Sequence, residues 1–275
     1  MPELPEVETV RRTLTPAIGA RIAAVWDSGM PLHMQRRPPR KKLRALVGAK
    51  ITDIRRHGKY LLLDTDRPES LLVHLGMTGR FCIHAQREPR ATHTHLVLSL
   101  GRRELRFADP RRFGQLDVFA RAEERAHPAL AVLGPDALVH GVDPAALLEV
   151  ARRRSRTTLK AFLLDQSVIA GVGNIYASEA LWRAQLRPTW RARRLTAASA
   201  RRLADAVREV IGTAIENGGT TLSDFVDADG AAGENADFLW VYAREGKPCP
   251  RCQGLIRRSV QGGRATYFCP TCQAP

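Results

Sequence analysis

The chain has 275 residues and carries 43 Lys and Arg against 28 Asp and Glu, which gives a net charge of +15 and a pI near 10.6. So basic a chain suits a polyanionic partner, nucleic acid above all, better than an acidic metabolite. The apolar runs fall far short of the ~20 residues of a bilayer span, and the acidic start does not match a signal peptide, so we expect a cytosolic protein without a membrane partner.

The chain opens with MPELPEVETV, which crowds Glu3, Glu6, Glu8 and two prolines into its first eight positions. An initiator methionine before a small residue is normally removed, so Pro2 is expected to become a free secondary amine. We expect a short helix around Val7 to Leu14, and acids at a helix start also complement its dipole. The local pattern therefore leaves two readings, an accident of the start site or the reactive group of an enzyme.

From Arg21 to about Phe119 the sequence has the pattern of short strands. KYLLLDTD, SLLVHLGM and RFCIHA are apolar segments bounded by Gly, Pro or Asp, and THLVLSLGRRELRFAD holds two β-type runs around a turn at Gly101. This spacing predicts an antiparallel sandwich or barrel. Cys82 lies in one of these strands, where we interpret it as a small buried apolar residue.

Beyond a boundary at about residues 127–138 the pattern becomes helical, as in VDPAALLEVARRR and ASARRLADAVREVIGTAI. In LDQSVIAGVGNIYASEALWRAQ we expect a helix that ends near Ile169, a tight turn, and a helix that begins at Asn174 with its N–H groups available to an anion. The basic run from Arg152 to Lys160 favours a phosphate contact. The Gly- and Asp-rich stretch from Asn217 to Gly233 predicts a long loop, and such loops are often functional.

The strongest local signal is CPRCQGLIRRSVQGGRATYFCPTC, in which two CxxC pairs are separated by 16 residues. This spacing suits a tetrahedral structural zinc held by Cys249, Cys252, Cys269 and Cys272. Two disulfides are the alternative, which a reducing cytosol disfavours. The metal would fold a hairpin that has little apolar content of its own. Arg264 follows the Gly-Gly turn, where it either contacts a phosphate or is simply solvated.

Seven separated segments carry a resemblance that runs from the first residues to the last: MPELPEVET, HGKYLLL, HLGMTG, DPRRFG, GVGNIYASE, GGTTLSDF and the cysteine hairpin. In their order they resemble the bacterial formamidopyrimidine-DNA glycosylases. The resemblance implies an α+β fold, with an N-terminal antiparallel β-sandwich that carries an N-terminal helix, a C-terminal helical domain of the helix-two-turn-helix type, and a zinc β-hairpin. The implied domains are a catalytic domain (1–130), a DNA-binding domain with a lesion-capping loop at about 217–240 (131–240) and a zinc finger (241–275).

The resemblance also implies an activity, that of a bifunctional DNA glycosylase and apurinic/apyrimidinic lyase of base excision repair. Its substrates would be 8-oxoguanine and formamidopyrimidines in duplex DNA, and abasic sites. Pro2 would form a Schiff base with the sugar, which then fragments by β- and δ-elimination. We expect one structural Zn²⁺, duplex DNA as the partner, a monomer, and association with the nucleoid through DNA.

Catalytic roles are implied for five residues. Besides the Pro2 nucleophile, Glu3 would protonate the sugar ring oxygen, and Glu6 would position the amine and the sugar. Lys59 would act as a general acid and a phosphate or base contact. Arg264 matches the family's phosphate-binding arginine, which is also implicated in δ-elimination. The resemblance leaves Glu8 with a structural role.

Other matched positions concern the grip on DNA. Met77, Arg111 and Phe113 match the residues that fill the space left by an extruded nucleotide, although Met77 and Phe113 could instead be ordinary core. The family's lysine in the basic run falls near Ser155 and Arg156, so a neighbouring arginine would replace it. The DNA-contacting set implied by the resemblance is His74, Met77, His93, Arg111, Phe113, Arg154, Arg156 and Asn174.

Two other functions stay open. An endonuclease VIII-like glycosylase shares the proline end, the helical module and the zinc hairpin but favours oxidised pyrimidines, whereas ELPEVET and the set Met77, Arg111 and Phe113 favour oxidised purines. A non-catalytic, zinc-containing binder of damaged DNA would have an inert terminus, and retention of Met1 would favour it because the Pro2 nitrogen would then be an amide. Binding by either class should weaken steeply with salt.

Overall fold

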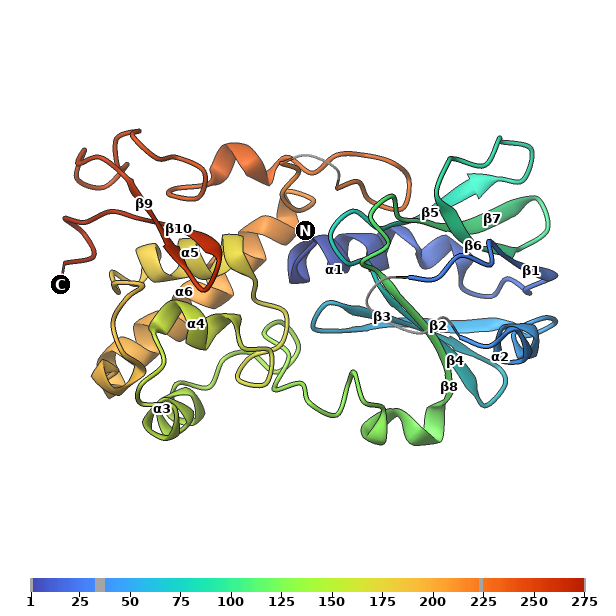
Figure 1. Cartoon of the computed structure of the whole chain (residues 1–275), viewed down its shortest axis with the longest axis horizontal. Coiled ribbons are helices and arrows are strands. Elements are labelled where there is room, and N and C mark those ends of the chain that lie inside the picture. Colours follow the sequence, from blue (N-terminus) through green and yellow to red (C-terminus); the bar gives the residue numbers. More distant parts are fainter. Residues whose placement is uncertain (1, 33–37, 223–224, 275) are drawn as a thin grey trace. The chain divides into compact units, whose positions relative to one another are not determined.

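The structure is a computed structural model that describes residues 2–32, 38–222 and 225–274 (Figure 1). Within these ranges no helix combines the length and the apolar character needed to cross a bilayer. The helices and strands follow one another as α1 (Leu4–Thr13), β1 (Ala24–Asp27), α2 (Arg40–Ala45), β2 (Ile51–His57), β3 (Tyr60–Thr65), β4 (Glu69–His74), β5 (Arg80–Ala85), β6 (Thr94–Ser99), β7 (Arg103–Ala108), β8 (Gln115–Ala120), α3 (Pro144–Arg153), α4 (Leu159–Leu164), α5 (Asn174–Arg183), α6 (Ala197–Glu216), β9 (Arg257–Gln261) and β10 (Arg264–Phe268).

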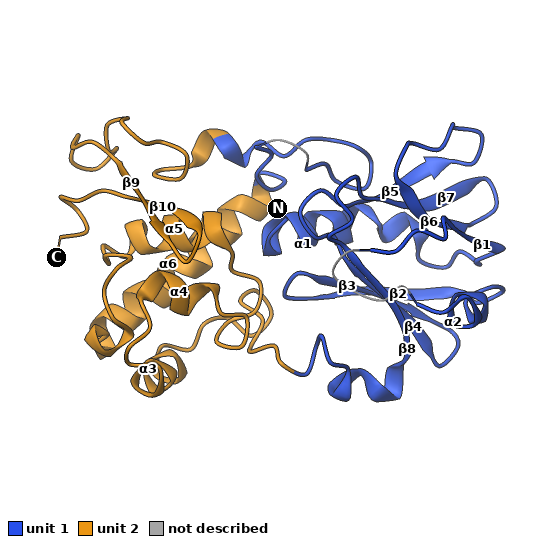
Figure 2. Cartoon of the chain, in the orientation of Figure 1, with its two compact units in different colours: residues 1–131, 217–236 blue, residues 132–216, 237–275 orange. Residues whose placement is uncertain are grey.

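The chain divides into two compact units, coloured separately in Figure 2. Unit 1 comprises residues 1–131 and 217–236, and unit 2 comprises residues 132–216 and 237–275. The segment 217–236 follows α6 directly in the chain, yet it packs with the N-terminal residues. Its Phe225 and Ala228 join the apolar core of unit 1.

Unit 1 is built from two antiparallel four-stranded sheets, with strand orders β1-β6-β7-β5 and β2-β3-β4-β8. Alternate side chains of each sheet point to a common core, as expected for a two-residue period. Leu61 and Leu63 of β3 share this core with Leu96 and Leu98 of β6. The expected antiparallel sandwich is confirmed.

Helix α1 begins at Leu4, three residues before the expected start at Val7. Pro5 fits the first helical turn, where no N–H is required of it. Glu3 and Glu6 form a capping box, in which each side chain accepts the backbone N–H of the other residue. Val7 and other apolar residues on one face of the helix are buried against the sandwich.

Strands β2 and β3 are joined by a two-residue turn, Gly58-Lys59, because His57 pairs directly with Tyr60. Gly58 has a φ of +55°. A positive φ at the first turn residue suits a two-residue hairpin turn with glycine there. The turn therefore places Lys59 at the tip of a short, rigid hairpin.

Unit 2 contains the helices α3 to α6 and the β9–β10 hairpin. The expected helix end near Ile169 is wrong, because α4 ends at Leu164. The carboxylate of Asp165 accepts the Ser167 N–H at 3.0 Å and the Ser167 hydroxyl at 2.7 Å. Such a local turn competes with helical hydrogen bonding and ends the helix. The next helix, α5, begins at Asn174 as predicted.

The β9–β10 hairpin turns at Gly262 and Gly263, between the paired residues Gln261 and Arg264. The two glycines have φ values of +55° and +73°. A type I′ hairpin turn requires positive φ at both central residues, which glycine adopts without steric cost. Arg264 is thereby presented on the first residue of β10, where it is exposed to solvent.

Candidate functional site

The first turn of α1 brings two acidic residues next to Pro2. The Glu3 N–H donates to Glu6 Oε2 at 2.7 Å, and the Thr220 N–H donates to Glu6 Oε1 at 2.7 Å. Glu3 and Glu6 are each only 1% exposed. One buried carboxylate therefore holds both the start of the chain and the segment 217–236 of the same unit.

Further contacts tie this segment to unit 1. The Ala228 N–H donates to Thr13 Oγ1 at 3.0 Å, and the Cys82 thiol donates to the Asp227 carbonyl at 3.3 Å. Gly219 has a φ of +86°, a conformation that favours glycine, and a Cβ there would come within 3.1 Å of Glu6 Cγ. Burial raises the pKa of Cys82 to about 11, so its thiol stays protonated. Cys82 is buried as expected, and it also anchors the segment.

Lys59, at the tip of the β2–β3 hairpin, is 8% exposed and lies near His74. Burial and the positive charge of Lys59 lower the pKa of His74 to about 4. Its Nδ1 accepts the Gly76 N–H at 3.1 Å, and its ring packs on Tyr60 with 4.7 Å between centroids. The His74 ring is therefore uncharged near pH 7, so it does not attract an anion through a positive charge.

The low pKa of His74 predicts an acid-sensitive stability. Because the unfolded chain takes up this proton near pH 6.5 and the folded chain only near pH 4, this residue should cost about 3 kcal/mol of the free energy of unfolding as the pH falls through that window. Above pH 6.5 the ring is neutral in both states and contributes no pH dependence. Urea denaturation of His74→Gln should show a flatter loss of stability between these pH values. The unchanged protein should keep the full slope, and equal slopes in the two proteins would contradict the assignment.

Asp109 fixes two loops of unit 1 beside each other. Its buried carboxylate accepts the Thr78 hydroxyl at 2.6 Å and the Gly114 N–H at 2.7 Å. A Cβ on Gly76 would lie 2.5 Å from the Gly114 nitrogen, so the two backbones touch where only glycine fits. Sequence reasoning missed Asp109, although an acid before a proline in DPRRFG marks a fixed turn.

These two loops carry the three matched residues Met77, Arg111 and Phe113. Met77 is 38% exposed, so it is not a core residue. The Arg111 guanidinium lies 4.9 Å from the centroid of the half-buried Phe113 ring. His93 is exposed, adopts a φ of +65°, and its carbonyl accepts the Asp109 N–H at 3.0 Å. An apolar tip, an aromatic ring and a cation are thus grouped on one rigid edge.

In unit 2, Asn174 joins the start of α5 to the zinc hairpin. Its Nδ2 donates to the Ala265 carbonyl at 2.9 Å and to the Tyr242 hydroxyl at 3.3 Å. Lys160 is only 1% exposed, and its Nζ donates to the Asn174 carbonyl at 2.9 Å and to the Ser178 hydroxyl. Sequence reasoning took Lys160 as the end of a basic run that favours a phosphate contact. The signal that it is buried was the apolar spacing around it in TLKAFLL.

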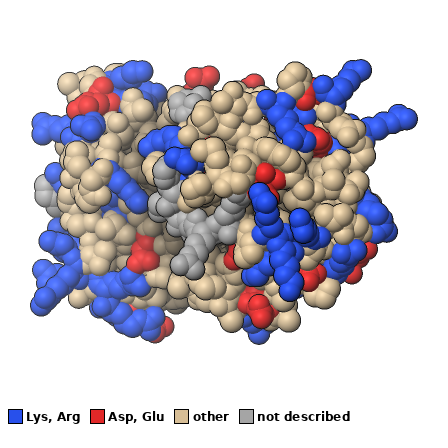
Figure 3. Space-filling view, turned by 45° about the vertical axis from the view of Figure 1, so that its right-hand side comes forward, with Lys and Arg blue, Asp and Glu red and all other residues tan. Residues whose placement is uncertain are grey.

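Arg264 borders a cavity of about 470 Å³ in unit 2 that Lys160, Thr158 and Asp165 also line. Arg154 and Arg156, the two candidate arginines of the basic run, differ in their surroundings. Both are exposed, but the Arg154 guanidinium pairs with the Asp165 carboxylate and donates to the Ser167 hydroxyl at 2.9 Å. Lys and Arg side chains predominate over acidic ones on the face drawn in Figure 3.

The four hairpin cysteines form a cluster that fits one zinc ion. Their sulfur atoms all lie within 4.8 Å of one another, with 3.5 Å between Cys252 and Cys269 and 3.9 Å between Cys249 and Cys272. Zinc bound to four thiolates at about 2.3 Å requires sulfur–sulfur separations of about 3.8 Å. The Trp182 indole N–H donates to Cys249 Sγ at 3.4 Å and so helps to orient this ligand. The cofactor is therefore one structural zinc.

Comparison with known protein families covers most of the chain. Residues 1–116 match the formamidopyrimidine-DNA glycosylase N-terminal domain. Residues 133–226 match the formamidopyrimidine-DNA glycosylase H2TH domain, and residues 246–275 match a zinc finger found in FPG and IleRS. The helix-two-turn-helix and zinc parts of the expected α+β fold are thereby confirmed.

Similar full-length proteins carry one name. A formamidopyrimidine-DNA glycosylase of Cereibacter sphaeroides is 44% identical over 284 residues, covering 99% of this chain and 100% of that protein. One of Herpetosiphon aurantiacus is 44% identical over 278 residues, and the alignment covers both chains in full.

Solved structures agree with the sequence comparison. The complex between a Lactococcus lactis FPG mutant and a Fapy-dG containing DNA has a TM-score of 0.92 at 32% identity, with full coverage of both chains. The complex between Lactococcus lactis Fpg and an abasic site containing DNA has a TM-score of 0.91 at 32% identity, covering 99% of this chain and 100% of that one. A third complex, of wild-type Lactococcus lactis FPG with an oxidized pyrimidine containing DNA, has a TM-score of 0.91 at 32% identity, again with full coverage. The chain therefore belongs to the formamidopyrimidine-DNA glycosylase family.

Proposed function

We propose that the chain is a bifunctional DNA glycosylase and apurinic/apyrimidinic lyase that excises oxidised purines, namely 8-oxoguanine and formamidopyrimidines, from duplex DNA in base excision repair. The observation that carries the proposal is the first turn of α1, where the buried Glu3 follows Pro2 directly and the buried Glu6 carboxylate accepts the Glu3 N–H. An enzyme of this kind acts on the chromosome, so we propose that it associates with the nucleoid through DNA.

Before any reaction, removal of Met1 from the new chain frees the Pro2 amine. An α-amino group has a reference pKa near ~8 against ~10.4 for lysine, so roughly a tenth of it is unprotonated at pH 7, compared with under about a thousandth of a lysine. The end of the chain thus supplies a nucleophile without a buried lysine. A secondary amine is somewhat more basic than this reference, which makes a tenth an upper value.

The lone pair of the Pro2 nitrogen forms a bond to C1′ while the bond from C1′ to the base breaks. The base leaves with the electron pair of the broken bond and with a proton. Loss of the N–H proton and opening of the sugar ring give an iminium, with Glu3 protonating the ring oxygen. The iminium acidifies the neighbouring C–H bond, so the 3′ phosphate leaves by β-elimination and the 5′ phosphate by δ-elimination. Glu6 positions the amine and the sugar, and Lys59 serves as the general acid and a phosphate or base contact.

The other candidate residues serve to grip the DNA. Arg264 and Asn174 hold backbone phosphates beside the zinc hairpin, and the exposed Arg156 is a better substitute for the family's basic contact than Arg154, whose charge is paired with Asp165. The loops fixed by Asp109 fill the space left by an extruded nucleotide with Met77, Arg111 and Phe113. His74 and His93 complete the set of DNA contacts.

We propose that function divides along the chain as catalytic (1–130), DNA-binding (131–240) and zinc finger (241–275) parts. The loop at about 217–240 caps the extruded lesion. Its ties to Glu6 and Thr13 support this role, because they connect it to the helix that begins beside Pro2.

The test is borohydride trapping on a duplex with 8-oxoguanine opposite cytosine, followed by mass mapping of the adduct. We expect a reduced covalent product on Pro2. A protein with confirmed loss of Met1, bound zinc and measurable lesion binding that gives no adduct would instead be a non-catalytic binder.

Similarity to the Lactococcus lactis complex with an oxidized pyrimidine containing DNA supports a second substrate class. Trapping by thymine glycol alone would assign the chain to that class.

A further inference from the structure

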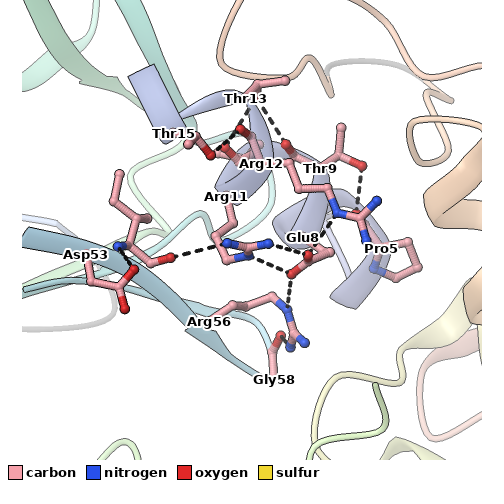
Figure 4. Close-up of polar contacts among 12 residues, drawn as sticks. Pro5, Glu8, Thr9, Arg11, Arg12, Thr13, Thr15, Asp53, Arg56 and Gly58 are labelled. Carbon is pink, nitrogen blue, oxygen red and sulfur yellow. Dashed lines mark hydrogen bonds and ion pairs between the residues drawn. The ribbon is translucent and has the colours of Figure 1, made fainter. Parts of the chain in front are cut away.

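Glu8 lies two residues after Glu6 on α1 and is 5% exposed. Its carboxylate accepts hydrogen bonds from three arginines, as Figure 4 shows: Arg11 at 2.8 and 3.0 Å, Arg12 at 3.0 Å and Arg56 at 3.1 Å. Burial raises the pKa of Glu8, but the hydrogen bonds from these arginines outweigh it and leave the pKa below its ordinary value. The Glu8 carboxylate is therefore ionised, and its negative charge is paired with three arginines.

Arg56 differs from the other two arginines in what else it binds. Its side chain, on β2, is only 2% exposed. While Nε donates to Glu8, Nη1 of the same guanidinium donates to the Gly58 carbonyl at 2.9 Å (Figure 4). That carbonyl belongs to the peptide bond that joins Gly58 to Lys59. Because a guanidinium is a rigid planar fork, two bonds from it fix the relative placement of their acceptors.

Neutralising Glu8 does not account for Arg56. Arg11 and Arg12 already supply two positive charges to this carboxylate. A buried ion pair is moreover weak evidence for stability, since apolar residues often replace one without loss. The contact that Arg11 and Arg12 do not share is the one to the hairpin turn, immediately before a residue of the proposed catalytic set.

We propose that Glu8 and Arg56 form a positioning pair that holds Lys59 in register with the helix that begins beside Pro2. This inference rests on the proposed function, because it assigns the pair a role only through Lys59. The long Lys59 side chain amplifies any rotation of the Gly58-Lys59 peptide plane at its ammonium group. Misplacement of a catalytic group by about 1 Å can cost about a hundredfold in rate.

A double-mutant cycle tests the proposal, because residues that act through one another are not additive. The rate of 8-oxoguanine excision is measured in a single turnover with enzyme in excess, for the unchanged protein, Arg56→Gln, Lys59→Ala and the double variant. We expect Arg56→Gln to slow excision about 10- to 100-fold with lesion-DNA affinity kept within about twofold. In the Lys59→Ala background the same substitution should have no further effect.

Two more variants sharpen the result. Arg12→Gln removes a hydrogen bond to Glu8 without touching the turn, so its excision rate should stay within about twofold of the unchanged protein. Arg56→Lys keeps a positive charge beside Glu8, but a single ammonium cannot reproduce the fork. It should fold even if Arg56→Gln does not, and it should still be slowed.

The outcomes separate the pair from the proposed function. Multiplication of the Arg56→Gln and Lys59→Ala effects, or an equal loss in Arg12→Gln, would overturn the pair as a positioning device while leaving Lys59 catalytic. An unchanged rate in Lys59→Ala would overturn both the pair and the role of Lys59. In that case borohydride trapping on Pro2 still decides the glycosylase reaction separately.

Discussion

A chain extended by one large residue between Met1 and Pro2 is expected to lose both base excision and strand cleavage, by at least about a thousandfold. A large second residue prevents removal of the initiator methionine, so the Pro2 nitrogen stays an amide. An amide lone pair is delocalised into the carbonyl and cannot attack C1′. Single-turnover assays on 8-oxoguanine opposite cytosine, with and without borohydride, measure both losses.

Pro2→Gly provides a graded comparison with the extended chain. Glycine keeps an amine at the end of the chain, so an imine can still form, but the ring that fixes the direction of the nitrogen lone pair is gone. We expect excision to slow by about 10- to 1000-fold and the trapped adduct to be strongly reduced.

The control for the extended chain is proteolytic removal of the extension, which should restore the rate. Lesion binding measured in parallel should be retained, because the phosphate contacts are independent of the amine. An extended chain that excises at the normal rate would rule out Pro2 as the nucleophile and leave a lysine such as Lys59 to be tested.

Patterns of local sequence predicted much of this molecule. The short apolar segments KYLLLDTD and SLLVHLGM, bounded by Gly, Pro or Asp, predicted strands, and the structure pairs them as β3 and β4. Two glycines before Arg264 predicted the β9–β10 turn, and the spacing of four cysteines predicted their cluster. Each of these features is determined by residues within one short segment of the chain, where backbone geometry and side-chain chemistry act directly.

Features that depend on distant residues were not predictable in this way. Glu8 reads as an acid that complements a helix dipole, and its pairing with Arg56 spans 48 residues. Lys160 reads as the last member of a charged run, yet it is buried against the start of α5. Burial of a charged group depends on which carbonyl or hydroxyl the fold brings to it, and sequence spacing carries no such information.

The return of the segment 217–236 to unit 1 is a further example. Its Gly and Asp content predicted a loop, but the hydrogen bonds of Thr220 to Glu6 and of Ala228 to Thr13 each span more than 200 residues. The predicted position of the end of α4 was wrong for the opposite reason. A single Asp165 side chain overrode an apolar helical pattern that continued for several residues.

Removal of zinc is expected to have the other large effect on lesion-DNA affinity and excision. The hairpin shares an apolar cluster of only five buried residues, two of which are the ligands Cys249 and Cys269. A structural zinc in so small a module supplies about 10–16 kcal/mol of binding free energy that is also folding free energy. Chelation, or Cys269→Ser, should therefore unfold the hairpin and release Arg264 together with the Ala265 carbonyl that Asn174 binds.

The expected result is a loss of lesion-DNA affinity and of excision by about a hundredfold or more, since Arg264 and the start of α5 lose their fixed relation. The sandwich of unit 1 has its own apolar core, so its thermal transition should persist. Cys82→Ser is the matched control, because it changes a buried cysteine outside the cluster and keeps a donor for the Asp227 carbonyl. It should retain zinc and activity. Full activity of a protein shown to contain no zinc would mean that the hairpin folds without the metal, and the role assigned to the four thiolates would be wrong.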